Sequence, residues 1–439
     1  MEATFVVIGG GIAGVSCAES IAFLAPEENV ILISASPLIK AATNIIAFGK
    51  TLTQFDVEER STNSLTEVFS SVMVFNDIVT KVDKSSKTVF TENGKIISYK
   101  KLCICTGARP KLICENNSRV IGIRDTESVE TFVEKLKGSK RIIVVATFID
   151  PGAAEFFQER LLKKENDTDN QPVKRMKYTI TNDNSIKGGP ALGPDWHDNF
   201  KFKKGNALST VQVEYESEIV KIMDTLETSD QENENWPVYA QLTTGKIIGC
   251  DLIVSATGVV PNSNMIGLES LNQDKDGGYI VDWKLETSEP EIFAAGDVCS
   301  VGWEIAPRWF QMRLWTQAHQ MGKYAAKSMV STLKKEEFFQ DFCFELFTHV
   351  TKFFGYKVVL LGLYNGQKLE KDYEILLRVT KGQEYVKLVV KNGKMQGAVL
   401  IGETDLEEMC ENLILNQLDI SMYGEDLLNP DIDIEDYFD

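Results

Sequence analysis

A glycine-rich segment near the start of the chain has the composition and spacing of a phosphate-binding loop. Residues 9–14 read Gly-Gly-Gly-Ile-Ala-Gly and fit the pattern G-x-G-x-x-G, between an apolar run at residues 5–8 and a helical composition at residues 12–23. In such a strand–loop–helix unit the glycines allow a tight turn and a close approach of the backbone to a pyrophosphate, whose charge the helix N-terminus stabilises. The predicted binding residues are Gly9, Gly11, Ile12, Ala13 and Gly14. A glycine turn that binds no ligand is the alternative.

The residues after the second strand of this unit depart from the usual pattern. A dinucleotide-binding unit commonly has an acidic residue there, which binds the ribose hydroxyls. This chain has an apolar run at residues 30–33, followed by Ser34 and Ser36 with no carboxylate between them. A serine hydroxyl makes single hydrogen bonds and cannot act as an ionised bidentate acceptor. We therefore expect Ser34 or Ser36 to contact the ribose, with a weaker hold on the adenosine.

Composition and charge exclude several other functions. The 439 residues carry 64 acidic and 46 basic side chains, for a formal charge of −18, which argues against direct nucleic-acid binding through a basic surface. No run reaches the roughly 18 apolar residues that a membrane span requires. His197, His319 and His349 lie too far apart in the sequence to suggest a metal site or a hydrolytic triad. The eight cysteines include no C-x-x-C pair and the N-terminus has no targeting pattern, so we expect an intracellular, reducing setting.

The elements that position these residues alternate between strands and helices, and the length predicts two or three domains. We expect strands at residues 5–8, 30–33, 72–75, 88–90, 102–105, 141–145, 211–215, 252–256, 292–295, 357–363, 374–380, 386–391 and 397–401. We expect helices at residues 12–23, 150–162 and 309–333. The last hundred residues resemble a separate α+β unit that ends in an acidic tail.

Four features in a fixed order resemble one family of flavoproteins. They are the glycine loop at residues 9–14, Cys-Thr-Gly-Ala-Arg-Pro at 105–110, Ala-Thr-Gly-Val-Val-Pro-Asn at 256–262, and Thr287 followed by Ala-Ala-Gly-Asp at 294–297. Together they are similar to the two-dinucleotide-binding-domain flavoproteins, the pyridine nucleotide-disulfide oxidoreductase superfamily. The resemblance implies that the first loop binds the FAD pyrophosphate and that the two Thr-Gly segments mark chain crossings between FAD and NAD domains.

The same resemblance implies further cofactor contacts and a domain plan. Thr106, Gly107, Gly296 and Asp297 are expected at the FAD, with Asp297 on a ribityl hydroxyl; a helix N-cap is a competing role for Asp297. The expected fold class is α/β: a Rossmann-like, three-layer FAD-binding domain in two segments, 1–138 and 257–334. An incomplete NAD(P)-type domain at 139–256 and a C-terminal α+β domain at 335–439 complete the plan.

Two absences set this chain apart from the family pattern. The stretch 37–48 contains no cysteine, so the redox-active cysteine pair of the disulfide reductases is missing there. Cys103 and Cys105 face the same side of a strand and are interpreted as small core residues. After the strand at 141–145 the chain reads Ala-Thr-Phe-Ile-Asp-Pro, with no second glycine loop. We expect about one βαβ unit, roughly 30 residues, to be missing, and the NAD(P)H site to be damaged or lost.

Lys40 is the predicted catalytic residue. It matches a position where many relatives have a lysine near the flavin, paired with a glutamate that would fall in the missing segment, so Lys40 is expected to be unpaired. A solvated surface lysine is the alternative. Trp315 and Gln317 are expected beside the flavin ring, with core packing as the competing interpretation for Trp315.

The resulting function is an FAD-dependent oxidoreductase that takes electrons from NAD(P)H and passes them to a small-molecule or protein acceptor without a redox disulfide. The alternative is a flavin-binding or apo scaffold whose acidic tail docks a basic partner, against a tail that is merely solvated. A likeness along the whole chain, carried by residues 36–40, 191–197 and 311–318 and the tail, implies more. It implies a cytoplasmic and nuclear protein of oxidative-stress protection and of muscle, including the sarcomere, that also protects a redox-sensitive RNA ligase complex.

Overall fold

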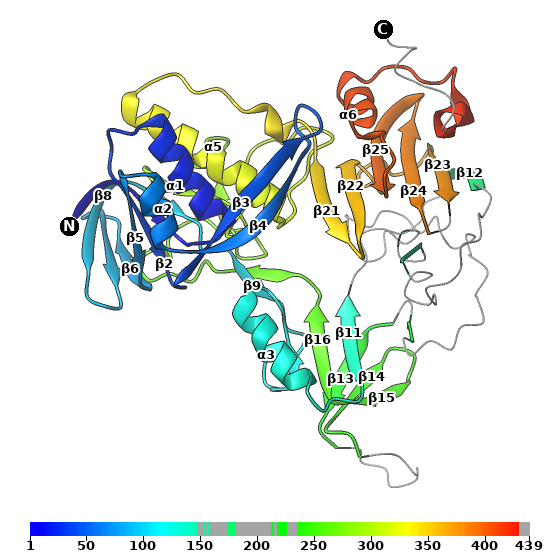
Figure 1. Cartoon of the computed structure of the whole chain (residues 1–439), viewed down its shortest axis with the longest axis horizontal. Coiled ribbons are helices and arrows are strands. Elements are labelled where there is room, and N and C mark those ends of the chain that lie inside the picture. The colour runs from blue at the N-terminus through cyan, green and yellow to red at the C-terminus, as the bar shows by residue number, and fades with distance from the viewer. Residues whose placement is uncertain are drawn as a thin grey trace.

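The computed structural model describes residues 1–146, 153, 156–157, 174–180, 212–214, 217–225, 235–380 and 382–429. Figure 1 shows three parts: a first unit that contains the N-terminus, a smaller unit around β11 and β16, and a C-terminal sheet with α6 beside it. No helix of the described residues is both long enough and apolar enough to cross a membrane. The expected strand at 211–215 is not found, because residues 212–214 have no regular structure. The expected helix at 150–162, residues 191–197 and residues 430–439 of the tail lie largely or wholly outside the described residues.

The first unit is built on a sheet with the strand order β5-β2-β1-β8-β7-β6, and β19 pairs with β8. The bounds are β1 Glu2–Ile8, β2 Val30–Ser34, β5 Val72–Asn76, β6 Val79–Asp83, β7 Thr88–Thr91, β8 Ile96–Ile104 and β19 Ile292–Ala294. β1 and β2 are buried along almost their whole length, as expected for parallel strands covered on both faces. Since β19 comes from a distant part of the chain, this unit is assembled from two segments. Its parallel strands and the helices between them confirm the α/β fold class.

Two helices pack together on this sheet. They are α1, Ile12–Leu24, and α5, Trp315–Lys334. The helices approach so closely that a Cβ atom on Gly322 would lie 2.3 Å from the carbonyl oxygen of Ala13. The predicted start of α5 at residue 309 is wrong. The backbone is extended at Leu314, where the Gln317 side chain accepts from the Met312 N–H and donates to the Phe310 carbonyl.

A long hairpin leaves the first unit and reaches the C-terminal part. Its strands are β3, Leu38–Ala47, and β4, Thr53–Ser61, which pair only with each other among the described residues. A short helix, α2 at Asn63–Val68, leads from β4 back to the sheet. Figure 1 shows the hairpin running from the N-terminal end of α1 towards β21.

The chain leaves and re-enters the first unit through two short strands that pair with each other. β9, Ala108–Pro110, and β17, Val259–Pro261, are antiparallel, and each follows one of the two Thr-Gly segments. Between them lie a parallel sheet in the order β10-β16-β11 and an antiparallel sheet in the order β13-β14-β15. The bounds are β10 Val120–Ile121, α3 Thr126–Leu136, β11 Ile142–Ala146, β13 Ile219–Met223, β14 Val238–Leu242, β15 Ile247–Cys250 and β16 Leu252–Ala256.

The C-terminal part is an antiparallel sheet in the order β12-β23-β24-β25-β22-β21. The bounds are β12 Lys174–Ile180, β21 Thr348–Phe353, β22 Tyr356–Gly362, β23 Tyr373–Thr380, β24 Glu384–Lys391, β25 Lys394–Ile401 and α6 Glu407–Asn416. The four strands expected here are confirmed. β21, β12 and α6 were not predicted. Two further strands, β18 Tyr279–Val281 and β20 Cys299–Val301, pair with each other in parallel.

Candidate functional site

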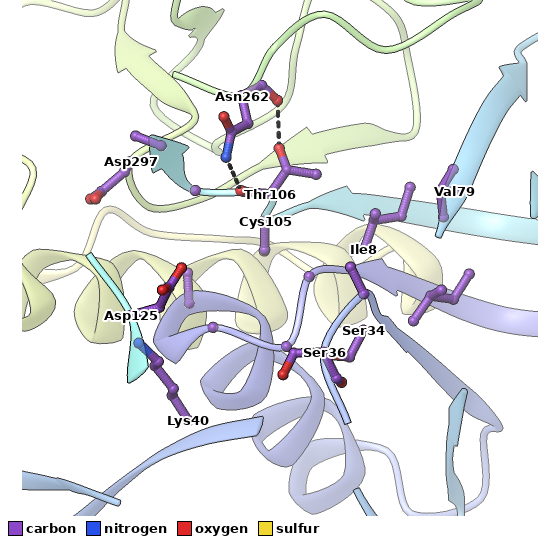
Figure 2. Close-up of a pocket in the computed structure, with 18 of the residues that line it drawn as sticks. Ile8, Ser34, Ser36, Lys40, Val79, Cys105, Thr106, Asp125, Asn262 and Asp297 are labelled. Carbon is purple, nitrogen blue, oxygen red and sulfur yellow. Dashed lines mark hydrogen bonds between the residues drawn. The ribbon is translucent and has the colours of Figure 1, made fainter. Parts of the chain in front are cut away.

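A cavity of about 880 Å³ opens at the carboxyl ends of β1, β2 and β8. It is lined by the glycine loop, by the turn after β2, by the first Thr-Gly crossing, by residues between 262 and 266 after β17, and by residues from β3, β4, α3 and the start of α5. Of the residues predicted from the sequence, eleven line this cavity: Gly9, Gly11, Ile12, Ala13, Ser34, Ser36, Lys40, Thr106, Gly107, Asp297 and Trp315. Gly14 and Gly296 lie directly behind the lining, against Gly9 and Ala13. Figure 2 shows how these segments meet.

The backbone of the glycine loop has the shape that a phosphate group requires. Gly9 has a φ of +122°, and a Cβ on it would lie 2.1 Å from the Cys105 carbonyl oxygen. A Cβ on Gly14 would lie 1.9 Å from the Gly9 carbonyl oxygen. Gly11, by contrast, has no atom within 4 Å of that position, so its backbone faces open space. Since no side chain caps α1 at Gly11, the first N–H groups of the helix are left for a ligand.

The two serines after β2 have different surroundings. Ser34 is buried and its hydroxyl donates to the Ser36 carbonyl at 2.7 Å, which holds the turn closed. The exposed Ser36 hydroxyl accepts from the Leu38 N–H at 3.1 Å. Each hydroxyl keeps acceptor capacity towards the cavity. No carboxylate follows β2 directly. The buried Asp77, which follows the neighbouring strand β5, lines the same end of the cavity and accepts a hydrogen bond from Lys95 at 3.2 Å.

The two Thr-Gly crossings are tied to each other at the cavity. The Thr106 hydroxyl donates to the Asn262 carbonyl at 2.7 Å, and the Asn262 side chain donates to the Thr106 carbonyl at 2.9 Å. Figure 2 shows this reciprocal pair. Gly107 and Gly258 have φ values of +66° and +105°, so each crossing turns in the left-handed region that favours glycine. The Thr106 hydroxyl therefore links the two chain crossings, and the residue also lines the cavity.

Asp297 is buried at the cavity and forms an ion pair with Arg124. The alternative role of Asp297 as a helix N-cap is wrong, because residues 296–298 form a turn and α5 begins only at Trp315. Arg124, which was not predicted, directly precedes Asp125, the N-cap residue of α3. Its neighbour Asp125 caps that helix by accepting from the Ser128 N–H at 2.8 Å. The spacing of Asp125 and Ser128 could have signalled this helix start, but not the partner of Arg124.

Lys40 lies opposite Glu59 on the β3–β4 hairpin, with Nζ 3.8 Å from the Glu59 carboxylate. The expectation of an unpaired Lys40 is therefore wrong: register within the hairpin supplies a carboxylate. Figure 2 shows the Lys40 side chain pointing towards Asp125. A hydrogen bond from the Ser128 backbone N–H lowers the pKa of Asp125, and the positive charges of Lys40 and Arg124 lower it further. Lys40 and Arg124 thus lie at the cavity together with the carboxylates of Glu59, Asp125 and Asp297.

The side chain of Trp315 stands at the cavity and is 49% exposed, which excludes core packing. Gln317, expected beside it, is buried and fixes the turn before α5 instead. The cysteines behind the glycine loop are free and buried, as predicted for Cys103 and Cys105. Their Sγ atoms lie 3.5 Å apart, and contact with Cys105 and Cys17 raises the pKa of Cys103. No group of three metal-ligating side chains occurs in the described part of the chain.

Comparison with known proteins shows which family has this architecture. The family model for pyridine nucleotide-disulphide oxidoreductases matches residues 3–147 and 209–322. The chain belongs to this family. A second model, the rubredoxin NAD+ reductase C-terminal domain, matches residues 349–418.

Two relatives of this chain share the description pyridine nucleotide-disulfide oxidoreductase domain-containing protein 1. The protein from Rattus norvegicus is 46% identical over 491 aligned residues, which cover 99% of this chain and 98% of the relative. The protein from Drosophila melanogaster is 43% identical, with 99% of each chain covered.

Solved structures share the fold. A chain of the covalent putidaredoxin reductase-putidaredoxin complex superposes with a TM-score of 0.65 at 14% identity, covering 98% of this chain and 97% of that chain. The NADH:rubredoxin oxidoreductase from Clostridium acetobutylicum gives a TM-score of 0.58 at 16% identity and covers 98% and 100%.

Proposed function

We propose that this family member is an FAD-dependent oxidoreductase that transfers electrons without a redox-active disulfide. The observation that carries the proposal is the glycine loop. At Gly9 and Gly14 neighbouring backbone atoms leave no room for a side chain, while Gly11 faces the open cavity. A dinucleotide pyrophosphate fits this arrangement, since uncapped helix N–H groups and a bare backbone surface meet at the same place.

The remaining lining fits the rest of FAD, which when bound supplies the hydride chemistry that side chains cannot. Asp297 would hold a ribityl hydroxyl, and Thr106, Gly107 and Gly296 would border the cofactor. Ser34 and Ser36 would face the adenosine ribose. Trp315 and Lys40 would border the flavin ring, where Lys40 supplies a positive charge that Glu59 holds in place.

The cysteines support chemistry without a disulfide. All eight are free, and none falls in residues 37–48, the stretch where the resemblance to the family's disulfide reductases places their redox pair. Cys105 reaches the lining, but it is buried beside Cys103. Contact with Cys105 and Cys17, together with burial, raises the pKa of the Cys103 thiol and so disfavours its thiolate, which is the reactive form. Electrons would therefore leave the flavin directly for a small-molecule or protein acceptor.

A second candidate is a flavin-binding scaffold that has lost NAD(P)H turnover. The family model skips residues 148–208, and the alignment with the rat relative runs over 491 positions although this chain has 439 residues. Among the described residues β11 is also the last strand of the three-stranded sheet, and its Val144 side chain is 62% exposed. These observations favour a shortened NAD-type unit that follows β11 without a glycine loop.

An anaerobic titration separates the two candidates. Purified protein should show flavin absorbance, and NADH or NADPH should bleach it in the absence of air. A colourless protein that takes up no added FAD would contradict the cofactor assignment. A yellow protein that dithionite bleaches but neither nucleotide bleaches would favour the scaffold. The roles in oxidative stress and muscle, the cytoplasmic and nuclear location and the RNA ligase partner stay predictions.

A further inference from the structure

The β3–β4 hairpin connects the cavity with the C-terminal part of the molecule. One end carries Lys40 and Glu59 at the cavity. The other end, seven residues along β3, is the loop from Phe48 to Leu52, about 23 Å away at ~3.3 Å per strand residue. The side chain of Leu52 is fully buried in the core of the C-terminal part, and Phe48 packs against the same core. The hairpin therefore bridges two domains.

Glu411 holds this loop from helix α6. Its carboxylate is fully buried and accepts four hydrogen bonds: from the N–H groups of Lys50 and Thr51 at 2.7 Å, from the Thr51 hydroxyl at 2.6 Å, and from the Leu52 N–H at 3.2 Å. A buried carboxylate with this many donors makes strong, directional bonds. The fit is tight, because a Cβ on Gly49 would lie 1.7 Å from the Glu411 carboxylate.

The hairpin itself has little to hold its shape. Most of its side chains are exposed or half-buried, and no third strand is hydrogen-bonded to its two strands among the described residues, although β3 contacts α1 and β4 contacts β21. A lone two-stranded hairpin is marginally stable in water, so its contacts with the rest of the molecule, including those at its two ends, decide where it lies. At the cavity end, the Lys40 N–H donates to the Gly10 carbonyl at 2.9 Å. At the far end, Glu411 accepts four hydrogen bonds from the loop, and the Thr348 hydroxyl adds one by donating to the Thr51 carbonyl at 3.2 Å.

We propose that Glu411 is a positioning residue: by fixing the hairpin loop in the C-terminal domain, it sets where Lys40 and Glu59 lie at the cavity. This role rests on the proposed function, because Lys40 and Glu59 matter to the reaction only if the cavity binds the flavin. The C-terminal domain would then act on the redox site without touching it.

Hydrogen exchange on the full-length protein tests the proposal without relying on activity. Glu411→Gln keeps the shape of the side chain but sets an amide NH₂ against backbone donors. We expect exchange to be at least ~10-fold faster throughout residues 38–61, including the Lys40 amide that reports the bond to Gly10. Peptides from β1 should not change.

The matched control is Glu384→Gln, in the same C-terminal domain. Glu384 accepts from Arg378 at 3.1 Å and from Thr380 at 3.0 Å, away from the hairpin. It should leave exchange in residues 38–61 unchanged. Thr51→Val removes one of the four donors and should give a smaller change of the same pattern, which keeps the test usable if Glu411→Gln does not fold. Faster exchange confined to residues 48–52, or no change, would overturn the proposal.

The midpoint potential of the bound flavin gives a second readout. Glu411→Gln should shift it in the same direction as Lys40→Met, by a smaller amount, whereas Glu384→Gln should leave it unchanged. An unchanged potential in Glu411→Gln, alongside a shift in Lys40→Met, would contradict the positioning role. If the wild-type protein takes up no FAD, the proposed function fails, while the exchange experiment still decides whether Glu411 controls the hairpin.

Discussion

Two parts of this chain begin with a parallel strand of the same type, and they differ in what surrounds that strand. β1 lies between β2 and β8, and from Ala3 onward it is buried. Among the described residues β11 pairs only with β16, and Val144 at its centre is largely exposed. A parallel strand is normally buried on both faces. β1 meets this expectation, and β11 does not.

The difference between the two strands lies in the residues that follow them, and these residues decide whether a nucleotide can bind. After β1 the chain turns through three glycines into a helix, and the cavity lies at that turn. The residues directly after β11 contain no glycine before Gly152, and Pro151 has no N–H to offer an anion. In the part of the chain that the structure describes, a site is therefore built after β1, while the sequence directly after β11 lacks the glycine loop that such a site requires. The experiments below change one unit and compare it with the other.

The largest effect is expected at Gly11. Gly11→Val should fold normally, because no protein atom lies within 4 Å of the added Cβ, but the side chain would occupy the space proposed for the pyrophosphate. We expect FAD affinity to fall at least ~100-fold, equal to about 3 kcal/mol of binding free energy. The measurement is flavin content after purification, with circular dichroism as a control for folding. A yellow Gly11→Val protein would show that this loop is not the binding site.

A pair of valine substitutions tests the difference between the two strands. Val7→Ala, in the fully buried β1, should lower the free energy of unfolding by about 2–3 kcal/mol, because two methyl groups leave a closed core. Val144→Ala on β11 should change it by less than about 0.5 kcal/mol. Urea unfolding of both variants measures this. Equal losses would mean that β11 is covered as well as β1 and that the NAD-type unit is complete.

The pH dependence of the free energy of unfolding tests the contact between α1 and α5 in the core of the first unit. Burial lowers the pKa of His319 to about 4, and the nearby Lys323 adds to the effect. His319 contacts the Ser16 hydroxyl at 2.8 Å, between α5 and α1. Since the unfolded histidine takes up a proton near pH 6.5, its contribution is complete above that pH and is lost as the pH falls towards 4.

This loss should amount to about 2 kcal/mol at pH 5. Urea unfolding at pH 7 and pH 5 measures it, and His319→Gln should remove this part of the pH dependence. His349, whose pKa burial also lowers to about 4, lies in the C-terminal part and should keep its own share. A His319→Gln protein with the full wild-type pH dependence would contradict the assignment.

The parts that the sequence could predict are those that depend on local pattern. The glycine loop and the buried strands were recognised because backbone conformation and apolar runs are written in consecutive residues. The partners of charged side chains were not. Glu59 meets Lys40 only through the register of the β3–β4 hairpin, and Arg124 meets Asp297 across 173 residues. Such pairs depend on tertiary packing, which leaves no mark on local sequence.

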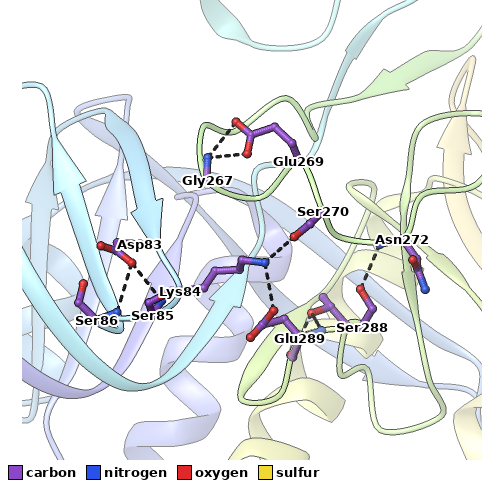
Figure 3. Close-up of polar contacts among 11 residues, drawn as sticks. Asp83, Lys84, Ser85, Ser86, Gly267, Glu269, Ser270, Asn272, Ser288 and Glu289 are labelled. Atoms are coloured by element: carbon purple, nitrogen blue, oxygen red, sulfur yellow. Dashed lines mark hydrogen bonds and ion pairs between the residues drawn. The ribbon is translucent and has the colours of Figure 1, made fainter.

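The smallest effect is expected at the ion pairs that join the two segments of the first unit. Figure 3 shows Lys84, in the turn after β6, bonded to Ser270 and, at 3.1 Å, to Glu289. Lys84→Met should lower the free energy of unfolding by no more than about 1 kcal/mol, because half-exposed ion pairs are weak.

The matched control is Lys137→Met, which removes an exposed pair with Glu134 on and after α3, outside the first unit, and should have no measurable effect. Raising the salt concentration should narrow the difference between the wild type and Lys84→Met, since screening weakens exposed pairs. A loss well above 1 kcal/mol that salt does not reduce would mean that Lys84 does more than pair charges. The first unit would then depend on this contact to hold its two chain segments together, a requirement that the continuous segment around β11 does not have.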